Sequence, residues 1–206
     1  MENSILANDG PHKSLSDFLE LIAHELPRES FSLLLSAYKV DGRDGIKCHC
    51  ECRDMKSVDY FYALSDGCRM IEFSDLESQF NSISGKIAEI KGSDISKPLK
   101  REIVTNYNKE IVKEFSTKYQ HSFLIRNQLD KAFSDVPNGM VGGQLEYHII
   151  ISRPDSSDEN ENMDFTRFLE TFSGKIMQSI PDSMLCPILV YDISSLVTPK
   201  LNVAMN

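Results

Sequence analysis

The stretch SFSLLLSAYKVDGRDGIKCHCECR, residues 30–53, decides the fold class because it reads as a β-hairpin. Two β-prone runs flank a short loop that contains Asp41-Gly42 and Asp44-Gly45. These dipeptides most readily supply the positive φ that a tight turn needs. We therefore expect strands near residues 31–40 and 46–53.

The segments on either side of this hairpin extend the pattern. Upstream, residues 1–12 are predicted to be a mobile end, and Ser14 caps a predicted helix that runs to about Glu25. Downstream, residues 58–64 and 68–73 predict a second pair of strands around a turn at residues 65–67. Four short consecutive strands suggest an antiparallel meander, with helices on one face and a more polar opposite face.

The middle of the chain is helical. Residues 74–77, Ser-Asp-Leu-Glu, form a capping-box pattern, and the helix behind them is expected to stop at Lys91-Gly92. A second helical pattern opens at residues 96–98. Its apolar residues recur every four positions, which predicts either a stripe that winds around one long helix or a break near Thr105-Asn106. A weaker pattern covers residues 123–133.

The last third alternates strand and helix. We expect a strand over residues 144–153, an acidic loop over 154–162, an amphipathic helix over 163–180 and a closing strand over 186–194. Two apolar strands joined by a helix are typical of parallel neighbours. The sequence therefore predicts one α+β domain over residues 1–206, with a mostly antiparallel sheet of about six strands and three to five helices packed largely on one face.

Composition limits the classes of function. The chain has 206 residues and a net charge of −9, which argues against nucleic acid as the main partner. Residues 86–131 differ, with ten Lys or Arg against six Asp or Glu, and predict a solvated helical surface or a basic face for an acidic partner. The sequence has no secretory signal and no long apolar run, and its five cysteines are an odd number. These features favour a soluble cytoplasmic protein without a membrane segment.

The cysteines of the hairpin offer a candidate metal or redox site. Cys48, Cys50, Cys52 and Cys68 are the residues concerned. Zinc-bound sulfurs lie within about 4 Å of each other, whereas residues two apart on a regular strand are separated by about 6.6 Å. The alternation with charged residues therefore favours a buried strand face packed with cysteine, and a thiol or metal site is the alternative.

Two histidine and glutamate pairs offer a candidate catalytic site. Glu146 and His148 share one face of a predicted strand, and His49 and Glu51 repeat the spacing on the hairpin. A carboxylate beside an imidazole orients it for general base catalysis. If the two strands were neighbours, the pairs would form one cluster.

None of the common nucleotide, hydrolase or metalloprotease motifs occurs in the sequence. We therefore expect a non-enzymatic protein-binding or assembly module, such as an inhibitor, adaptor or immunity-type protein, that uses no cofactor and binds a protein partner or forms a homo-oligomer. An enzyme with a His/Glu site and a thiol or metal protein are the alternatives.

Overall fold

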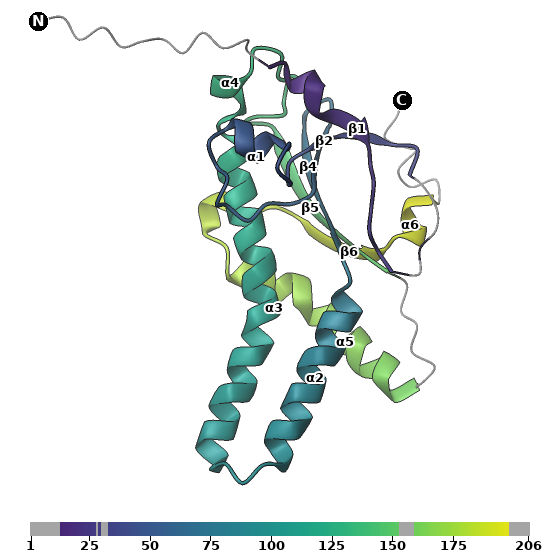
Figure 1. Ribbon diagram of the computed structural model, residues 1–206, viewed down its shortest axis with the longest axis vertical. Coiled ribbons are helices and arrows are strands. Elements are labelled where there is room, and N and C mark those ends of the chain that lie inside the picture. Colours follow the sequence, from purple (N-terminus) through teal and green to yellow (C-terminus); the bar gives the residue numbers. More distant parts are fainter. Residues whose placement is uncertain (1–12, 28, 30–32, 153–158, 198–206) are drawn as a thin grey trace, which may run out of the picture.

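The structure, a computed structural model, describes residues 13–27, 29, 33–152 and 159–197. Within them six strands form one mixed sheet, with long helices against one of its faces (Figure 1). In order across the sheet the strands are β1 (Leu19–Leu21), β2 (Ser36–Lys39), β3 (Tyr60–Ala63), β4 (Gly67–Ser74), β5 (Gln144–Ile151) and β6 (Ile188–Asp192). The helices are α1 (Ile46–His49), α2 (Leu76–Gly92), α3 (Lys97–Arg126), α4 (Leu129–Ala132), α5 (Glu159–Gln178) and α6 (Ser194–Val197), with 3-10 turns η1 (Leu15–Phe18) and η2 (Asp182–Met184).

The sheet confirms the α+β class, but it is mixed, so the expectation of a mostly antiparallel sheet is partly wrong. Strands β1 to β4 form an antiparallel meander, whereas β4–β5 and β5–β6 are parallel pairs. The parallel β5–β6 pair was predicted. The β4–β5 pair is also parallel because α2 and α3 form a long crossover that returns the chain to the edge of β4.

The predicted hairpin over residues 31–53 is wrong in its second half. Residues 36–39 form β2, but Ile46–His49 form the short helix α1, and residues 31–32 lie outside the described residues. Gly45 precedes α1, and a Cβ there would lie 2.3 Å from the carbonyl oxygen of Val40. At the predicted turn the chain therefore folds back onto the end of β2. It then forms a helical turn and no strand of the sheet.

The helix predicted from Ser14 to Glu25 is also wrong beyond its first turn. Ser14 does form a capping box with Asp17, but only η1 follows it. The chain then enters β1, where Leu19 lies opposite Tyr38 of β2. Tertiary pairing with the sheet therefore overrides the helical spacing of the apolar residues.

The central helices match their predictions more closely. α2 ends at Gly92 as expected, although Asp75 rather than Ser74 caps it, accepting a hydrogen bond from the Ser78 amide at 3.2 Å. Of the two alternatives for the second pattern, the structure shows one long helix, α3, which is continuous through Thr105-Asn106. Residues 123–133 divide between the end of α3 and the short α4. Of the predicted acidic loop, residues 154–158 lie outside the described residues and 159–162 belong to α5.

The main core lies between the sheet and the long helices. Tyr119 of α3 packs there against the sheet residue Tyr147, with ring centroids 5.4 Å apart, and Phe115 of α3 meets Phe172 of α5 at 5.2 Å. A smaller apolar cluster covers part of the opposite face, where Ile71 and Ile150 lie beside the segment that joins β1 to β2. The two faces are therefore unequal: one is covered by helices and the other by irregular chain.

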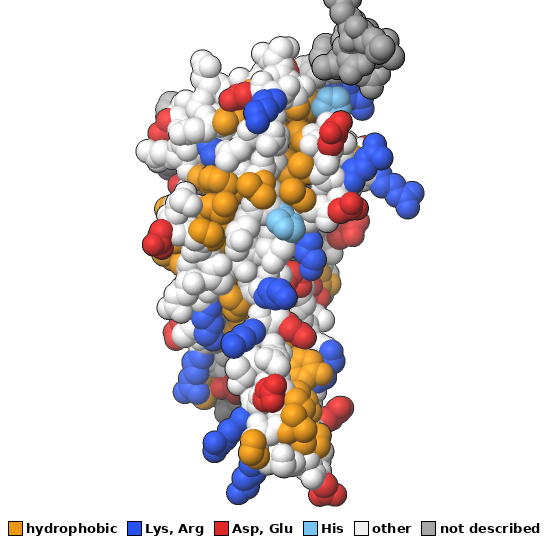
Figure 2. Space-filling model, turned by 90° about the vertical axis from the view of Figure 1, so that its left-hand side faces the viewer, with side chains coloured by type: hydrophobic (Ala, Val, Ile, Leu, Met, Phe, Trp, Pro, Cys, Tyr) orange, Lys and Arg blue, Asp and Glu red, His pale blue; other side chains and the backbone are white. Residues whose placement is uncertain are grey.

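The distal parts of α2 and α3 project together beyond the sheet (Figure 1). We call residues 78–110 the arm. None of its described side chains is buried, and Ile95 and Leu99 near the turn between the helices are 38% and 45% exposed. Blue basic side chains are spread along this end of the molecule, with orange apolar side chains among them (Figure 2). The arm is therefore a basic surface with incompletely covered apolar residues.

Candidate functional site

A cleft of about 430 Å³ opens between the meander and the segment that follows β1. Its walls come from residues 20–26, 39–42, 59–60 and 73–75. Five carboxylates line it, contributed by Glu20, Glu25, Asp41, Asp59 and Asp75. Lys39 is the cation of the lining, and its ammonium is held 3.2 Å from Asp44. We call this region the acidic cleft.

Aromatic rings form the apolar wall of the acidic cleft. His24 stacks on Phe73 with ring centroids 5.6 Å apart, and Tyr60 meets the edge of Phe73 at 6.4 Å. The Tyr60 hydroxyl donates to Glu20 at 3.1 Å and accepts from the amide of Ala23 at 3.2 Å. These contacts attach the segment after β1 to the sheet.

Asp41 lies on one side of the acidic cleft and is held by two donors. The Ser57 hydroxyl donates to its carboxylate at 2.9 Å, and the Lys47 ammonium of α1 forms an ion pair with it. Burial alone would raise the pKa of Asp41, but these hydrogen bonds outweigh it and lower the pKa. Asp41 is therefore ionised at neutral pH.

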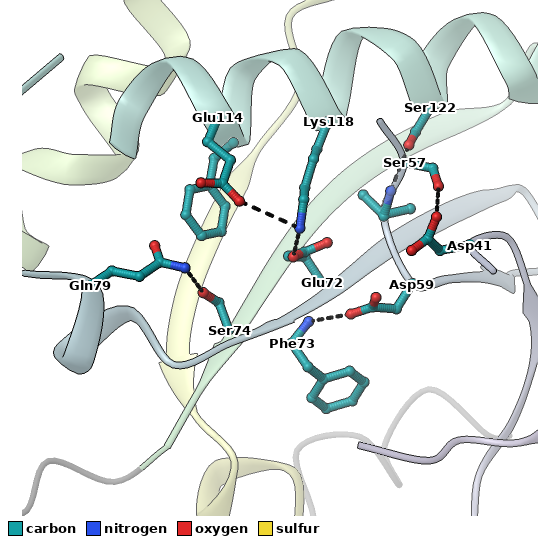
Figure 3. A network of polar contacts seen from close by, with 12 residues as sticks. Asp41, Ser57, Asp59, Glu72, Phe73, Ser74, Gln79, Glu114, Lys118 and Ser122 are labelled. Carbon is teal, nitrogen blue, oxygen red and sulfur yellow. Dashed lines mark hydrogen bonds and ion pairs between the residues drawn. The ribbon is translucent and has the colours of Figure 1, made fainter. Parts of the chain in front are cut away.

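Asp59 connects the acidic cleft to a buried polar network beneath α3 (Figure 3). Its carboxylate accepts a hydrogen bond from the Phe73 amide at 2.8 Å, and burial raises its pKa. Beside it Glu72 of β4 is 2% exposed and accepts a hydrogen bond from Lys118 Nζ at 2.5 Å. Glu114 lies 3.8 Å from the same ammonium, so Lys118 serves several carboxyl groups.

Glu72 has the most perturbed carboxyl of this network. Burial, strengthened by the nearby charge of Asp59, raises the pKa of Glu72 to about 8 despite the contact with Lys118. Its second oxygen, Oε2, has no hydrogen-bond partner among the described residues. A protonated carboxyl at neutral pH fits this environment better than a carboxylate, because one ammonium cannot neutralise all the acids around it.

The predicted pair Glu146 and His148 does meet, on the face of the sheet opposite to Glu72 and α3. Glu146 Oε2 lies 3.0 Å from His148 Nε2 and 2.6 Å from Arg69 Nε, and His148 Nδ1 lies 2.7 Å from the Tyr191 hydroxyl. Burial lowers the pKa of His148 and raises that of Tyr191 to about 12. A neutral imidazole then donates from Nε2 to Glu146 and accepts at Nδ1 from Tyr191. Since both nitrogens are engaged, a substrate would have to displace one of these partners.

The structure does not bring His49 and Glu51 to this cluster. His49 belongs to α1 and stacks on Phe133 with ring centroids 4.8 Å apart. Glu51 is exposed and has a φ of 58° in the turn after α1. The sequence predicts one His/Glu cluster only if the strand over residues 46–53 lies beside the strand over residues 144–153. Residues 46–49 form α1 instead of a strand, so that condition is not met.

The cysteines also leave the predicted strand. Cys48 lies in α1, where its thiol donates to the Gly42 carbonyl at 3.3 Å, and Cys52 donates to the carbonyl of Cys50 at 3.2 Å. Burial raises the pKa of Cys50 to about 11 and that of Cys68 to about 12. A protonated thiol is a poor nucleophile and metal ligand. Across the described ranges, no group of three or more His, Cys, Asp or Glu residues is arranged to hold a metal ion.

Sequence reasoning missed Glu72, Asp59 and Lys118. A usable signal exists for Glu72, because strict alternation along β4 places it on the same face as the buried Cys68 and Met70. Lys118 likewise lies between apolar positions of α3. The acidic cleft has no such signal, since it is assembled from four separate segments.

Chemically, the acidic cleft can bind a cationic group. Carboxylates supply charge and hydrogen-bond acceptors, and the rings of Tyr60 and Phe73 supply apolar surface. Of the helices in the described part of the chain, none has the length and apolar character needed to cross a membrane. Comparison of the chain with protein-family models, with curated proteins and with solved structures returned no match.

Proposed function

We propose that this chain is a protein-binding module, of the inhibitor, adaptor or immunity type, and that its acidic cleft receives a cationic side chain of a basic protein partner. The observation that carries the proposal is the lining of the cleft, in which five carboxylates face one lysine. The lysine is already paired with Asp44, and Asp41 is the one of the five carboxylates described above as paired with a lysine, Lys47. An incoming ammonium or guanidinium would therefore meet an excess of negative charge.

The position of the carboxylates supports a specific contact over general attraction. Glu25 is exposed, whereas Asp59 is half-buried, so the carboxyl groups of the lining lie at more than one depth. Charge interactions are stronger where water is excluded, and walls of one sign focus the field. Phe73 is half-buried and lines the cleft, so its side chain offers apolar surface to the stem of a lysine or an arginine.

The test is capture of partners from an extract of the native cells by the tagged chain, followed by quantitative mass spectrometry. The variant E20K/E25K reverses two charges of the acidic cleft. The matched control D130K/E170K changes net charge equally at two exposed helix positions outside it. We expect the wild type and the control to retain a basic protein. The affinity of E20K/E25K for that protein should be at least about tenfold lower, which corresponds to about 1.4 kcal/mol of binding free energy.

Circular dichroism and thermal unfolding would first establish that all three proteins are folded. Equal capture of the same protein by E20K/E25K and by the wild type would contradict the proposal. So would a partner whose binding strengthens when salt is added, because a charge-driven contact weakens as ions screen it.

A further inference from the structure

The arm is a second surface whose chemistry complements the acidic cleft. Residues 78–110 carry six Lys or Arg and four Asp or Glu, a net charge of +2, whereas the rest of the chain carries −11. At the tip, residues 91–101, four basic residues stand against Asp94 alone. Charge therefore separates the molecule into a positive arm and a negative body.

This charge separation decides between two ways of covering the arm. Parallel pairing of the arms of two copies would bring two tips of net charge +3 together, and like charges at an interface are unfavourable. Contact with an acidic surface would instead gain from the same charges. Within the part of the chain that the structure describes, the acidic cleft offers a concave surface of that kind.

Hydrogen bonds hold the tip of the arm in one conformation, and the tip carries basic side chains that an acidic cleft can bind. Lys100 Nζ donates to the carbonyl oxygens of Lys91 and Ser93 at 2.8 and 2.5 Å, which fixes the turn between α2 and α3. Lys97 and Arg101 are exposed and four residues apart, so they share one face of α3. A fixed tip loses less conformational entropy when it docks.

We propose that the arm tip of one copy docks in the acidic cleft of a second copy, so that the chain assembles head to tail. The inference rests on the proposed role of the cleft, which is to receive a cationic side chain, and it takes that side chain from the basic arm of a second copy and not from a separate basic protein. Lys97 or Arg101 supplies the cation for the carboxylates, and the apolar stem of the same side chain lies along the wall that Tyr60 and Phe73 form. Because the two surfaces differ, the contact is heterologous and builds rings or chains, unless two copies exchange arms.

Sedimentation velocity tests the proposal on the full-length protein at about 20 mM and about 300 mM salt, conditions that differ strongly in screening. We expect concentration-dependent association of the wild type at low salt and its loss at high salt. Variant K97E/R101E alters the arm, and E20K/E25K alters the acidic cleft. Each alone should associate at least tenfold more weakly, while the control D130K/E170K should associate as the wild type does.

Mixing the two variants gives the decisive measurement. The cleft variant retains a basic arm and the arm variant retains an acidic cleft, so an equimolar mixture should form a complex that neither protein forms alone. A wild type that stays monomeric at low salt overturns the inference, as does association that survives both charge reversals. A monomeric wild type that still captures a basic protein through Glu20 and Glu25 would overturn the inference while leaving the proposed function standing.

Discussion

Lys118 Nζ of α3 lies 2.5 Å from Glu72 Oε1 of β4, while Glu72 Oε2 has no hydrogen-bond partner among the described residues. The same ammonium is attracted by Asp59 and Glu114. A single positive charge thus serves three carboxyl groups, one of them nearly inaccessible to water. The network binds protons more tightly in the folded protein than in the unfolded chain, and stability should reveal this.

The first prediction concerns the pH dependence of stability. Because the pKa of Glu72 rises from 4.5 in the unfolded chain to about 8 in the folded protein, its contribution to stability is fully present below about pH 4.5 and is lost as pH rises toward 8. The slope is at most about 1.4 kcal/mol per pH unit. Urea unfolding between pH 5 and 8 should show a decline that is smaller in E72Q. Parallel profiles for the two proteins would contradict the assignment.

The second prediction concerns the lysine. In K118M the buried carboxyl loses its donor and remains protonated, because a lone buried charge is far more costly than a neutral acid. We expect a loss of about 1–3 kcal/mol in the free energy of unfolding. The double variant E72M/K118M should recover most of it, since both polar partners are then gone. A double variant whose loss equals the sum of the two single losses would show that the pair is not coupled.

The third prediction concerns a close backbone contact between the turn before β5 and the β3–β4 turn. A Cβ at Gly143 would lie 2.3 Å from the Asp66 carbonyl oxygen, which is far too short. G143A should therefore lose about 1–3 kcal/mol in thermal or chemical unfolding. Gly174 of α5 provides the matched control, because a Cβ there meets nothing within 4 Å. G174A should gain up to about 1 kcal/mol from its better helix propensity.

The fourth prediction concerns the thiols. Burial raises the pKa of Cys50 to about 11 and that of Cys68 to about 12, so both are protonated at pH 7.5. Cys68, which is fully buried, should react with a disulfide reagent only as fast as the protein unfolds. Mass spectrometry of quenched samples can follow the site of reaction. Rapid modification of Cys68 in the folded protein would favour the alternative of a thiol protein.

The sequence predicts the elements whose signals are local. The β3–β4 hairpin surrounds a Ser-Asp-Gly turn, α2 stops at Gly92, and β5, α5 and β6 are strongly apolar and periodic. All of these are present within two to four residues of their predicted bounds, as expected for strong periodic patterns. Stop signals and long apolar stripes depend little on distant parts of the chain.

The errors lie where two local patterns compete or where tertiary contacts decide. Alternation at Cys48, Cys50 and Cys52 covers few residues, and the chain instead forms α1 over Ile46–His49, with Cys50 at its C-cap. Near the N-terminus, Leu15 and Phe18 are buried as the helical spacing implied, yet Leu19 leaves that pattern to pair with β2. The acidic cleft is beyond local reasoning, because it depends on how separate segments meet.

The change from antiparallel to parallel pairing at β4 has a consequence for how the chain folds. β4 reaches β3 across the short turn at residues 64–66, but it reaches β5 only after residues 75–143. Closing a loop costs about 0.6 kcal/mol more for each doubling of its length, and distant pairings form slowly. We therefore expect the meander β1–β4 to form early in folding, before α2 and α3 have formed. The parallel half of the sheet then joins last, as a late and rate-limiting event.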